Sequence, residues 1–402
     1  MISVEDARNR ILASLRQSGI ESRTEMVGLT QAHGRVLARP LWARLTVPPA
    51  DVSAMDGYAL RAEDAKEGAL VRVIGEAPAG HPFAGQVGPG ETVRLFTGSV
   101  VPQGANAVLI QENTISQGAD IKVTEPVLVG KNIRRAGQDF TAEEQILPPG
   151  KRLSVRDIGL AGAAGCPWLC VYRRPRVAIL CTGDEIALPG EPLPAGGIAN
   201  SNAAMLAAFV TSHGGEPLVL PIARDTKEAI AQGARAAQGA DLLLTTGGAS
   251  VGAHDLVQLG LAQQGFALDF WKIAMRPGKP LIFGHVQEMP MLGLPGNPVS
   301  AYVCATLFLG PALAALSGLP PAPPFFATAR LAVPLKANDQ REDYLRALLE
   351  RDGHGWVVTP LPVQDSSMLR SLSRAGALVR RIPHAPAAET GDLVEILLLN
   401  DA

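Results

Sequence analysis

The sequence has almost no net charge. Its 402 residues include 36 Lys and Arg against 38 Asp and Glu, which gives a formal net charge of −2. Proteins that bind nucleic acid through their overall charge are strongly basic, so the composition offers no bulk attraction to DNA or RNA. Any anion site must therefore be local. The 47% hydrophobic and 18% charged residues are typical of a folded globular protein, without a signature of disorder.

Cysteine is also scarce. The four cysteines form no CxxC pair; only Cys166 and Cys170 lie near each other, and no histidine is beside them. We interpret them as reduced, mostly buried thiols, with a zinc site as a remote alternative. The first residues, MISVEDARNRI, lack the apolar core of a signal peptide, so we expect a cytoplasmic protein.

One long stretch lacks charge completely. The 41 residues 289–329 contain no Asp, Glu, Lys or Arg. However, Pro295, Pro298, Pro311 and Pro320 divide the stretch into pieces too short to cross a bilayer. We therefore expect a buried core helix followed by a proline-rich linker, and no membrane.

The length predicts two to four domains, because 402 residues exceed one ordinary core. Residues 1–50, with helical spacing of apolar residues, predict a helical linker region that part of 140–175 completes. Residues 51–139 alternate short β-type runs with Gly/Pro turns, which predicts a β domain. Residues 327–402 repeat that pattern and predict a small β-barrel or sandwich.

Residues 176–320 instead alternate apolar runs with helix-like segments. This pattern predicts an α/β domain with a parallel sheet and right-handed crossovers. In such sheets ligands bind at the carboxyl ends of the strands. Asp184, Glu185 and Asp225 follow predicted strands, so we expect them at one edge.

The stretch DLLLTTGGASVGAHDL, residues 241–256, passes from an apolar strand through a glycine-rich turn into a helix. Backbone N–H groups of such a turn bind anions at the positive end of the helix. Asp255, in the first helical turn, adds a carboxylate that could hold a cation. The alternative is a tight strand-to-helix turn with a helix-favouring acid.

Basic residues complete the predicted pocket. Lys272, Arg276 and Lys279 flank the turn Pro277–Gly278 and would supply positive charge. Acids, glycine amides and cations together suit a divalent metal that bridges phosphates. A salt-bridged sheet edge is the alternative interpretation.

Polar clusters outside this domain are less specific. Residues 46–60, TVPPADVSAMDGYAL, form either a surface loop or a ligand-facing loop. Arg134 and Arg135 alone indicate a solvated pair. The C-terminal clusters REDYLR (341–346) and QDSSMLR (364–370) would by themselves be ordinary surface.

Several motifs occur together in one order: SAMDGYA, TG, NIRRxGxD, CTGDE, TGGASVGxxD, PGKP and LPGNPVS. In this respect nearly the whole chain resembles the MoeA/gephyrin E-domain family of molybdopterin molybdenumtransferases. The resemblance implies a homodimer whose protomer has a helical linker, a β domain, a MogA-like α/β domain and a C-terminal β-barrel. It implies insertion of molybdate into adenylylated molybdopterin with Mg²⁺-dependent release of AMP. A MogA-type adenylyltransferase and molybdoenzyme maturation proteins are the partners it suggests.

The resemblance also assigns residues. Catalytic roles fall to Asp56, Glu185, Asp225 and Asp255, and the last three would hold the metal. The turn receiving the pterin or its phosphate contains Gly247, Gly248, Ser250 and Gly252, and the basic group is Lys272, Arg276 and Lys279. The remaining binding residues are Thr97 and Asp139 in the β domain, Ser300 in LPGNPVS, and Ser366 with Arg341 or Arg346 near the molybdate. The β domain of one protomer would reach the α/β pocket of the other.

The sequence departs from the family at several points. Arg276 stands where many relatives have Lys, Val52 where Asn is usual, Ala136 and Gln138 interrupt a motif, and QDSS replaces QGSH. Arg keeps the positive charge of Lys, but its planar guanidinium has several N–H donors arranged to suit tetrahedral oxyanions. The changes affect fine geometry and the choice between molybdate and tungstate.

Two other functions fit the resemblance. A related adenylyltransferase would need only residues 176–320, so the flanking domains argue against it. A non-enzymatic scaffold would not need the acids at 185, 225 and 255.

Overall fold

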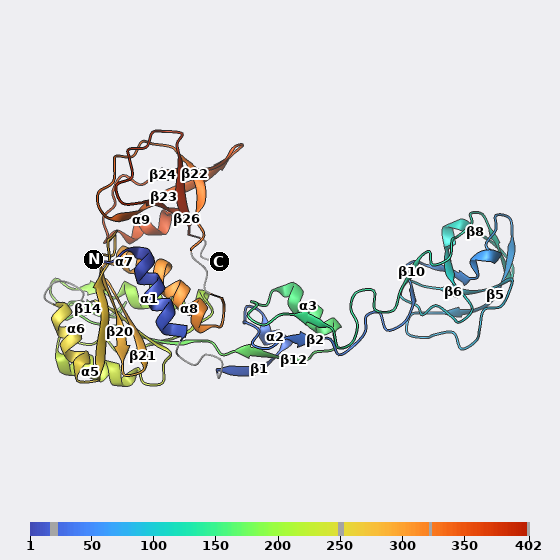
Figure 1. Cartoon of the computed structure of the whole chain (residues 1–402), viewed down its shortest axis with the longest axis horizontal. Coiled ribbons are helices and arrows are strands. Elements are labelled where there is room, and N and C mark those ends of the chain that lie inside the picture. Colours follow the sequence, from blue (N-terminus) through green and yellow to red (C-terminus); the bar gives the residue numbers. More distant parts are fainter. Residues whose placement is uncertain (17–22, 248–252, 321–323, 400–402) are drawn as a thin grey trace. The chain divides into compact units, whose positions relative to one another are not determined.

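A computed structural model describes residues 1–16, 23–247, 253–320 and 324–399, with only the backbone at 253–255. The chain divides into two compact units, and Figure 1 labels many of their elements. Unit 1 comprises Met1–Glu25, Gly34–Ala38 and Val171–Ala402, and unit 2 comprises Met26–His33 and Arg39–Cys170. Strands β1 (Thr24–Gly28) and β12 (Trp168–Tyr172) each contain one of the four points at which the chain passes from one unit to the other.

Unit 2 is built on a six-stranded sheet with the order β7-β4-β6-β5-β9-β8. Neighbouring residues such as Ala59 and Leu60 belong to different apolar clusters, because successive side chains of a strand point to opposite faces. Both faces of the sheet are therefore covered. Its strands are β4 (Gly57–Leu60), β5 (Leu70–Ala77), β6 (Glu91–Leu95), β7 (Ala107–Ile110), β8 (Thr114–Gln117) and β9 (Asp120–Val123).

The rest of unit 2 consists of short paired strands and two helices. A capping box starts α3: the Ser154 hydroxyl accepts from the Asp157 N–H, and the Asp157 carboxylate accepts from the Ser154 N–H. These elements are β2 (Leu41–Trp42), β3 (Val52–Ser53), β10 (Ile133–Arg134), β11 (Gln145–Leu147), α2 (Leu29–Ala32) and α3 (Val155–Ala163), with 3₁₀ turns at Ala62–Asp64 and Gln111–Asn113.

The α/β part of unit 1 contains a sheet with the order β16-β13-β17-β21-β20-β18, which confirms the predicted α/β class. The first four strands are parallel, whereas β20 runs antiparallel to both of its neighbours, β21 and β18. The sheet is thus mixed rather than wholly parallel. Only Gln287 and Glu288 separate β20 from β21, and two residues allow a hairpin but not a parallel crossover. The strands are β13 (Arg176–Cys181), β16 (Glu216–Val219), β17 (Leu242–Thr246), β18 (Phe266–Lys272), β20 (Pro280–Val286) and β21 (Met289–Leu294).

Helices cover both faces of this sheet. One buried cluster joins α5 and α6 to the face that carries Ala178 and Leu180. The other joins α1, α4, α7 and α8 to the face that carries Val177 and Ile179. Helix α1 therefore packs in the core of the α/β part, although the sequence grouped it with the linker region 1–50. The helices are α1 (Val4–Arg16), α4 (Ser201–Ser212), α5 (Lys227–Ala236), α6 (Ala253–Ala262), α7 (Pro298–Cys304) and α8 (Gly310–Leu316), with short strands β14 (Ile186–Ala187) and β15 (Ile198–Ala199).

Part of the uncharged stretch, Pro298–Leu316, forms one continuous helix. By length and composition it could cross a membrane, with a mean hydropathy of 1.8, but 72% of its most apolar window is buried inside the fold. The expectation that Pro311 would divide this stretch was wrong. A π-helical segment, Ala305–Leu309, precedes α8, and Pro311 falls in the first turn of α8, where its missing N–H is tolerated.

The C-terminal part is the predicted β-barrel. Five strands pair in the order β23-β24-β22-β26-β25, and β25 pairs again with β23, which closes the barrel. Strand β19 (Met275–Arg276), from the α/β part, adds to β23 in parallel. The barrel elements are β22 (Ala327–Leu331), β23 (Glu342–Asp352), β24 (Gly355–Pro360), α9 (Leu369–Arg374), β25 (Ala377–Arg381) and β26 (Leu393–Leu398).

Candidate active site

A cavity of about 530 Å³ lies at the carboxyl ends of β13, β17 and β21 in unit 1. The start of α4, the turn before α7, and residues of the C-terminal part before and within α9 complete its wall. This is where open α/β sheets bind ligands. Its lining residues are Cys181, Thr182, Glu185, Ile186, Ile198, Ala199, Asn200, Ser201, Asn202, Thr246, Gly247, Pro280, Pro295, Gly296, Asn297, Pro298, Ser367 and Leu369.

Glycine at 247 is required by the close approach of two strand ends. Gly247 has φ +96°, a conformation that favours glycine. A Cβ there would also lie 2.2 Å from the carbonyl oxygen of Thr182. The sequence selected this glycine for binding the pterin or its phosphate, which stays a prediction; the reason for glycine visible in the described residues is contact between β17 and β13.

A polar network supports the floor of the cavity. The Asn202 amide Nδ2 donates to Thr246 Oγ1 at 2.9 Å and to the Gly296 carbonyl at 2.7 Å. Thr246 Oγ1 in turn donates to the Pro295 carbonyl at 3.1 Å. Asn202 and Thr246 are both buried, so the network fixes the start of α4 against the ends of β17 and β21.

Two buried atoms of this floor have no hydrogen-bond partner within the described part of the chain, Thr182 Oγ1 and Asn202 Oδ1. Buried polar atoms are nearly always paired in native proteins, so each exception needs a reason. Thr182, Asn202 and Thr246 are not among the site residues predicted from the sequence. Their positions in the sequence could have identified them. Thr182 and Thr246 are polar residues at the ends of two buried strands, and Asn202 lies in the first turn of a buried helix.

Three acids gather beside the cavity. The Asp225 N–H donates to Asp184 Oδ1 at 3.4 Å, since the bridge between Thr182 and Ala223 brings their loops together. Burial, and then the negative charges of Asp184 and Glu185, raise the pKa of Asp225. Carboxylates that repel one another in this way favour a cation between them, and oxygen is the ligand that Mg²⁺ prefers. These carboxylates could therefore supply part of a Mg²⁺ shell.

The third predicted metal ligand, Asp255, falls in the first turn of α6, but its side chain lies outside the described residues, as do Gly248, Ser250 and Gly252. Among the side chains that the structure does describe, no group of three His, Cys, Asp or Glu forms a metal site by itself. Glu185 and Asp225 would thus need Asp255, or groups of the substrate, to complete a metal shell.

None of the three predicted basic residues lines the cavity. The Lys272 ammonium lies 3.6 Å from the centre of the Trp271 ring. Lys279 is exposed and precedes Pro280, a lining residue. Of the trio, Lys279 is therefore the cation nearest in sequence to the cavity.

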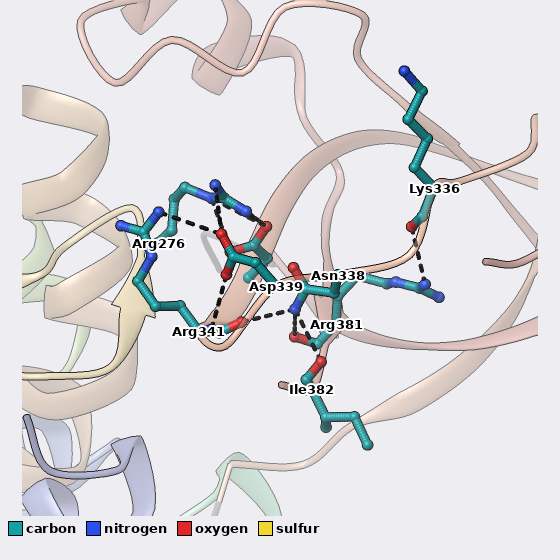
Figure 2. A network of polar contacts seen from close by, with 8 residues as sticks. Arg276, Lys336, Asn338, Asp339, Arg341, Arg381 and Ile382 are labelled. Carbon is teal, nitrogen blue, oxygen red and sulfur yellow. Dashed lines mark hydrogen bonds and ion pairs between the residues drawn. The ribbon is translucent and has the colours of Figure 1, made fainter. Parts of the chain in front are cut away.

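Arg276 makes contacts to the barrel instead. Its Nε donates to both carboxylate oxygens of Asp343, at 2.9 and 3.1 Å, and Nη2 pairs with the same carboxylate. Hydrogen bonding to Asp343 raises the pKa of Arg276. Figure 2 shows Arg276 and Arg341 both paired with Asp339, whose carboxylate lies 3.3 Å from Arg276 Nη1 and 3.6 Å from Arg341 Nη2. Asn338 holds this loop by donating to three barrel carbonyls, those of Arg341, Arg381 and Ile382.

The other residues predicted near the molybdate have structural contacts. Arg346 is 1% exposed; its Nη1 donates to the Asp365 carbonyl at 2.6 Å and its Nε to the Gln364 amide oxygen at 3.2 Å. Burial lowers the pKa of Arg346. Ser366 Oγ accepts from Asn297 Nδ2 at 2.8 Å, while its neighbour Ser367 lines the cavity. Ser300 is buried in α7 and does not line the cavity.

In unit 2 the structure brings two of the three predicted residues together. Asp56 Oδ1 accepts from the Thr97 N–H at 2.7 Å and from its hydroxyl at 2.9 Å, which lowers the pKa of Asp56. Asp139 is exposed, with no side-chain partner in the described chain. Arg135, interpreted as a solvated residue, pairs with Asp51.

Comparison with known families accounts for nearly all of this architecture. Residues 2–165 match the family described as MoeA N-terminal region (domain I and II), residues 178–315 a probable molybdopterin binding domain, and residues 328–399 the MoeA C-terminal region (domain IV). A protein of Nostoc sp. named molybdopterin molybdenumtransferase is 36% identical over 355 residues, covering 86% of this chain and 81% of its own. The chain belongs to the MoeA family. The resemblance seen in the sequence is thereby confirmed.

Other relatives extend the match. Molybdopterin molybdenumtransferase 2 of Mycobacterium tuberculosis is 36% identical and covers 94% of this chain and 95% of its own. A crystal structure of the molybdopterin biosynthesis MoeA protein from Pyrococcus horikoshii has a TM-score of 0.84 at 29% identity, with 100% of this chain and 99% of that chain covered.

Proposed function

We propose that the chain is a molybdopterin molybdenumtransferase of the cytoplasm, which inserts molybdate into adenylylated molybdopterin with Mg²⁺-dependent release of AMP. The observation that carries the proposal is the cavity of this MoeA-family chain, with a cluster of acids at one side. Its position at the carboxyl ends of parallel strands and its size suit a substrate of this kind.

Glu185 and Asp225, with Asp255, would hold Mg²⁺. When bound, the ion neutralises the charge that develops on a phosphoanhydride as it breaks. The chain's own part is to orient the substrate in the cavity. Lys279, exposed beside the lining residue Pro280, is placed to attract the oxyanion.

The role that we propose for Arg276, Arg341 and Arg346 differs from that of Lys279. Because each already contacts a group of the C-terminal part, we propose that they shape the cavity wall. Arg346 does this most directly: it holds Asp365, close to the lining residue Ser367. Ser366, bound to Asn297, ties the same loop to the turn before α7.

We further propose a homodimer in which the β domain of one protomer supplies Asp56, Thr97 and Asp139 to the pocket of the other. This rests on the family resemblance. The hydrogen bonds from Thr97 lower the pKa of Asp56 and so favour its ionised form, which suits a group facing Mg²⁺ or a cationic partner.

One experiment tests the function. Purified protein is incubated with adenylylated molybdopterin, Mg²⁺ and molybdate, and both AMP and active cofactor are measured. The proposal requires both products; no AMP, or AMP without active cofactor, would contradict it.

A further inference from the structure

The cavity floor contains two of the three buried, unpartnered side-chain atoms found in the described chain. These are Thr182 Oγ1 and Asn202 Oδ1; the third, Ser317 Oγ, belongs to a residue that does not line the cavity. Thr182 is 2% exposed and Asn202 8% exposed. Leaving such atoms unpaired is unfavourable, so their concentration at one cavity indicates a ligand that pairs with them.

The contacts of Asn202 determine which kind of ligand group fits. Both N–H bonds of its amide are used, one toward Thr246 Oγ1 and one toward the Gly296 carbonyl. A flipped amide would direct its oxygen at the Gly296 carbonyl, which cannot donate. The free atom is therefore Oδ1, which only accepts. It needs a ligand N–H or O–H.

The described lining residues offer no cation to an oxyanion at this position. Among the described lining residues the only ionisable acid or base other than Cys181 is Glu185, and none is Lys or Arg. Phosphate and molybdate oxygens are acceptors, and an acceptor facing Asn202 Oδ1 would be repelled. Apolar side chains, Ile186, Leu369 and Pro298, supply surfaces against which a flat ring can pack.

We propose that Asn202 Oδ1 accepts a hydrogen bond from the amino or ring N–H edge of the pterin. Thr182 Oγ1 makes a second hydrogen bond to the same ligand. The pterin thus binds at the floor of the cavity, and the phosphate and oxyanion lie toward the rim. This rests on the proposed function and deepens it by orienting the substrate.

Substitution of Thr182 gives the sharpest test. Thr182→Val keeps the shape and removes only the unpaired hydroxyl. The ligand-free variant should melt at the same or a higher temperature than the wild type, because an unsatisfied buried group has been removed. Its Kd for pterin, measured from the intrinsic fluorescence of pterin, should rise about fivefold to tenfold, the loss of one hydrogen bond.

Ser317→Ala is the matched control, since it removes the buried unpaired hydroxyl that lies away from the cavity. It should affect melting in the same way and leave the Kd for pterin unchanged. If Thr182→Val lowers the melting temperature and does not weaken binding, Thr182 has a structural role and its part of the proposal fails.

The role of Asn202 is tested by changing the ligand. The wild type should prefer pterin over its 2-dimethylamino analogue, which lacks the amino N–H bonds, by about tenfold. Asn202→Ala should lose that preference. If this variant does not fold, the preference of the wild type decides alone: equal affinity for the two ligands overturns the proposal.

The outcomes separate this inference from the proposed function. If the wild type forms active cofactor while Thr182→Val and Asn202→Ala keep normal pterin affinity, pterin does not bind at the cavity floor. The proposed function would still stand. A higher molybdate requirement in these variants, with unchanged pterin affinity, would place the oxyanion at the floor and overturn the proposal. A wild type that releases no AMP refutes the function.

Discussion

Arg276 Nε lies 2.9 and 3.1 Å from the two carboxylate oxygens of Asp343, a residue 67 positions further along the chain. The pair joins β19 of the α/β part to β23 of the barrel. The Asp343 side chain is 8% exposed and that of Arg276 47% exposed. A planar guanidinium can contact both oxygens at once, whereas an ammonium is a point charge. The arginine at this position therefore suits a connection between two parts of unit 1.

Arg276→Lys should weaken this connection. Because the Arg276 side chain is half exposed, we expect the free energy of unfolding to fall by about 1 kcal/mol rather than the larger loss typical of a buried pair. Denaturant unfolding measures the change. Arg330→Lys, which alters a more exposed pair on the same barrel, is the control and should change stability by less than about 0.5 kcal/mol. Equal effects would show that Arg276 has no special coupling role.

The lowered pKa of Asp157 predicts that the stability of the fold depends on pH. Burial alone would raise its pKa, but hydrogen bonds from Lys151 and Ser154 outweigh burial and leave the pKa below the ordinary 3.8. A lowered native pKa stabilises the fold above the unfolded value, and that stability is lost as pH falls through the native pKa. Asp157→Asn should cost about 1 kcal/mol at pH 7. In thermal melts the difference from wild type should shrink toward pH 3; a difference independent of pH would contradict this assignment.

Lys279→Ala tests the role of the exposed cation. If Lys279 gathers the oxyanion, the variant should need more molybdate for half-maximal insertion. AMP release at saturating molybdate should suffer less. Lys336→Ala, which removes an exposed lysine of the barrel, is the control. An unchanged molybdate requirement in Lys279→Ala would assign the lysine to the nucleotide or to structure.

The proposed dimer predicts complementation. Asp56→Ala and Asp255→Ala homodimers should each be impaired. A heterodimer with one mutation in each chain has one doubly damaged site and one intact site, if sites are built across a two-fold axis. Pure heterodimer should therefore recover up to about half of the wild-type activity. Confirmed heterodimers that remain as inactive as their parents would show that each β domain serves its own chain.

Much of the fold could be predicted from sequence because local patterns determine it. Apolar runs such as 177–181 and 242–244 indicated buried strands, and Gly/Pro spacing indicated the barrel. The direction of β20 depended on the two-residue connection Gln287–Glu288. The position of α1 could not be predicted, since an amphipathic helix does not reveal which surface it covers.

The site was harder to predict, because strand ends reveal a shared edge but not the partners that approach it from elsewhere. Asp184, Glu185 and Asp225 were placed correctly near one another by that argument. Asp343, far along the chain, could not be anticipated as the partner of Arg276. The unpaired oxygens of Thr182 and Asn202 depend on three-dimensional contacts that no spacing encodes.

The most direct test of the account compares wild type with Asp225→Asn in the adenylylated molybdopterin assay, with and without Mg²⁺ and molybdate. We predict that the wild type releases AMP and forms active cofactor only when Mg²⁺ is present. Asp225→Asn should fold but react roughly 10²–10³-fold more slowly, the loss expected for one well-placed electrostatic group. Near wild-type turnover by Asp225→Asn, or AMP release that does not depend on Mg²⁺, would contradict the account.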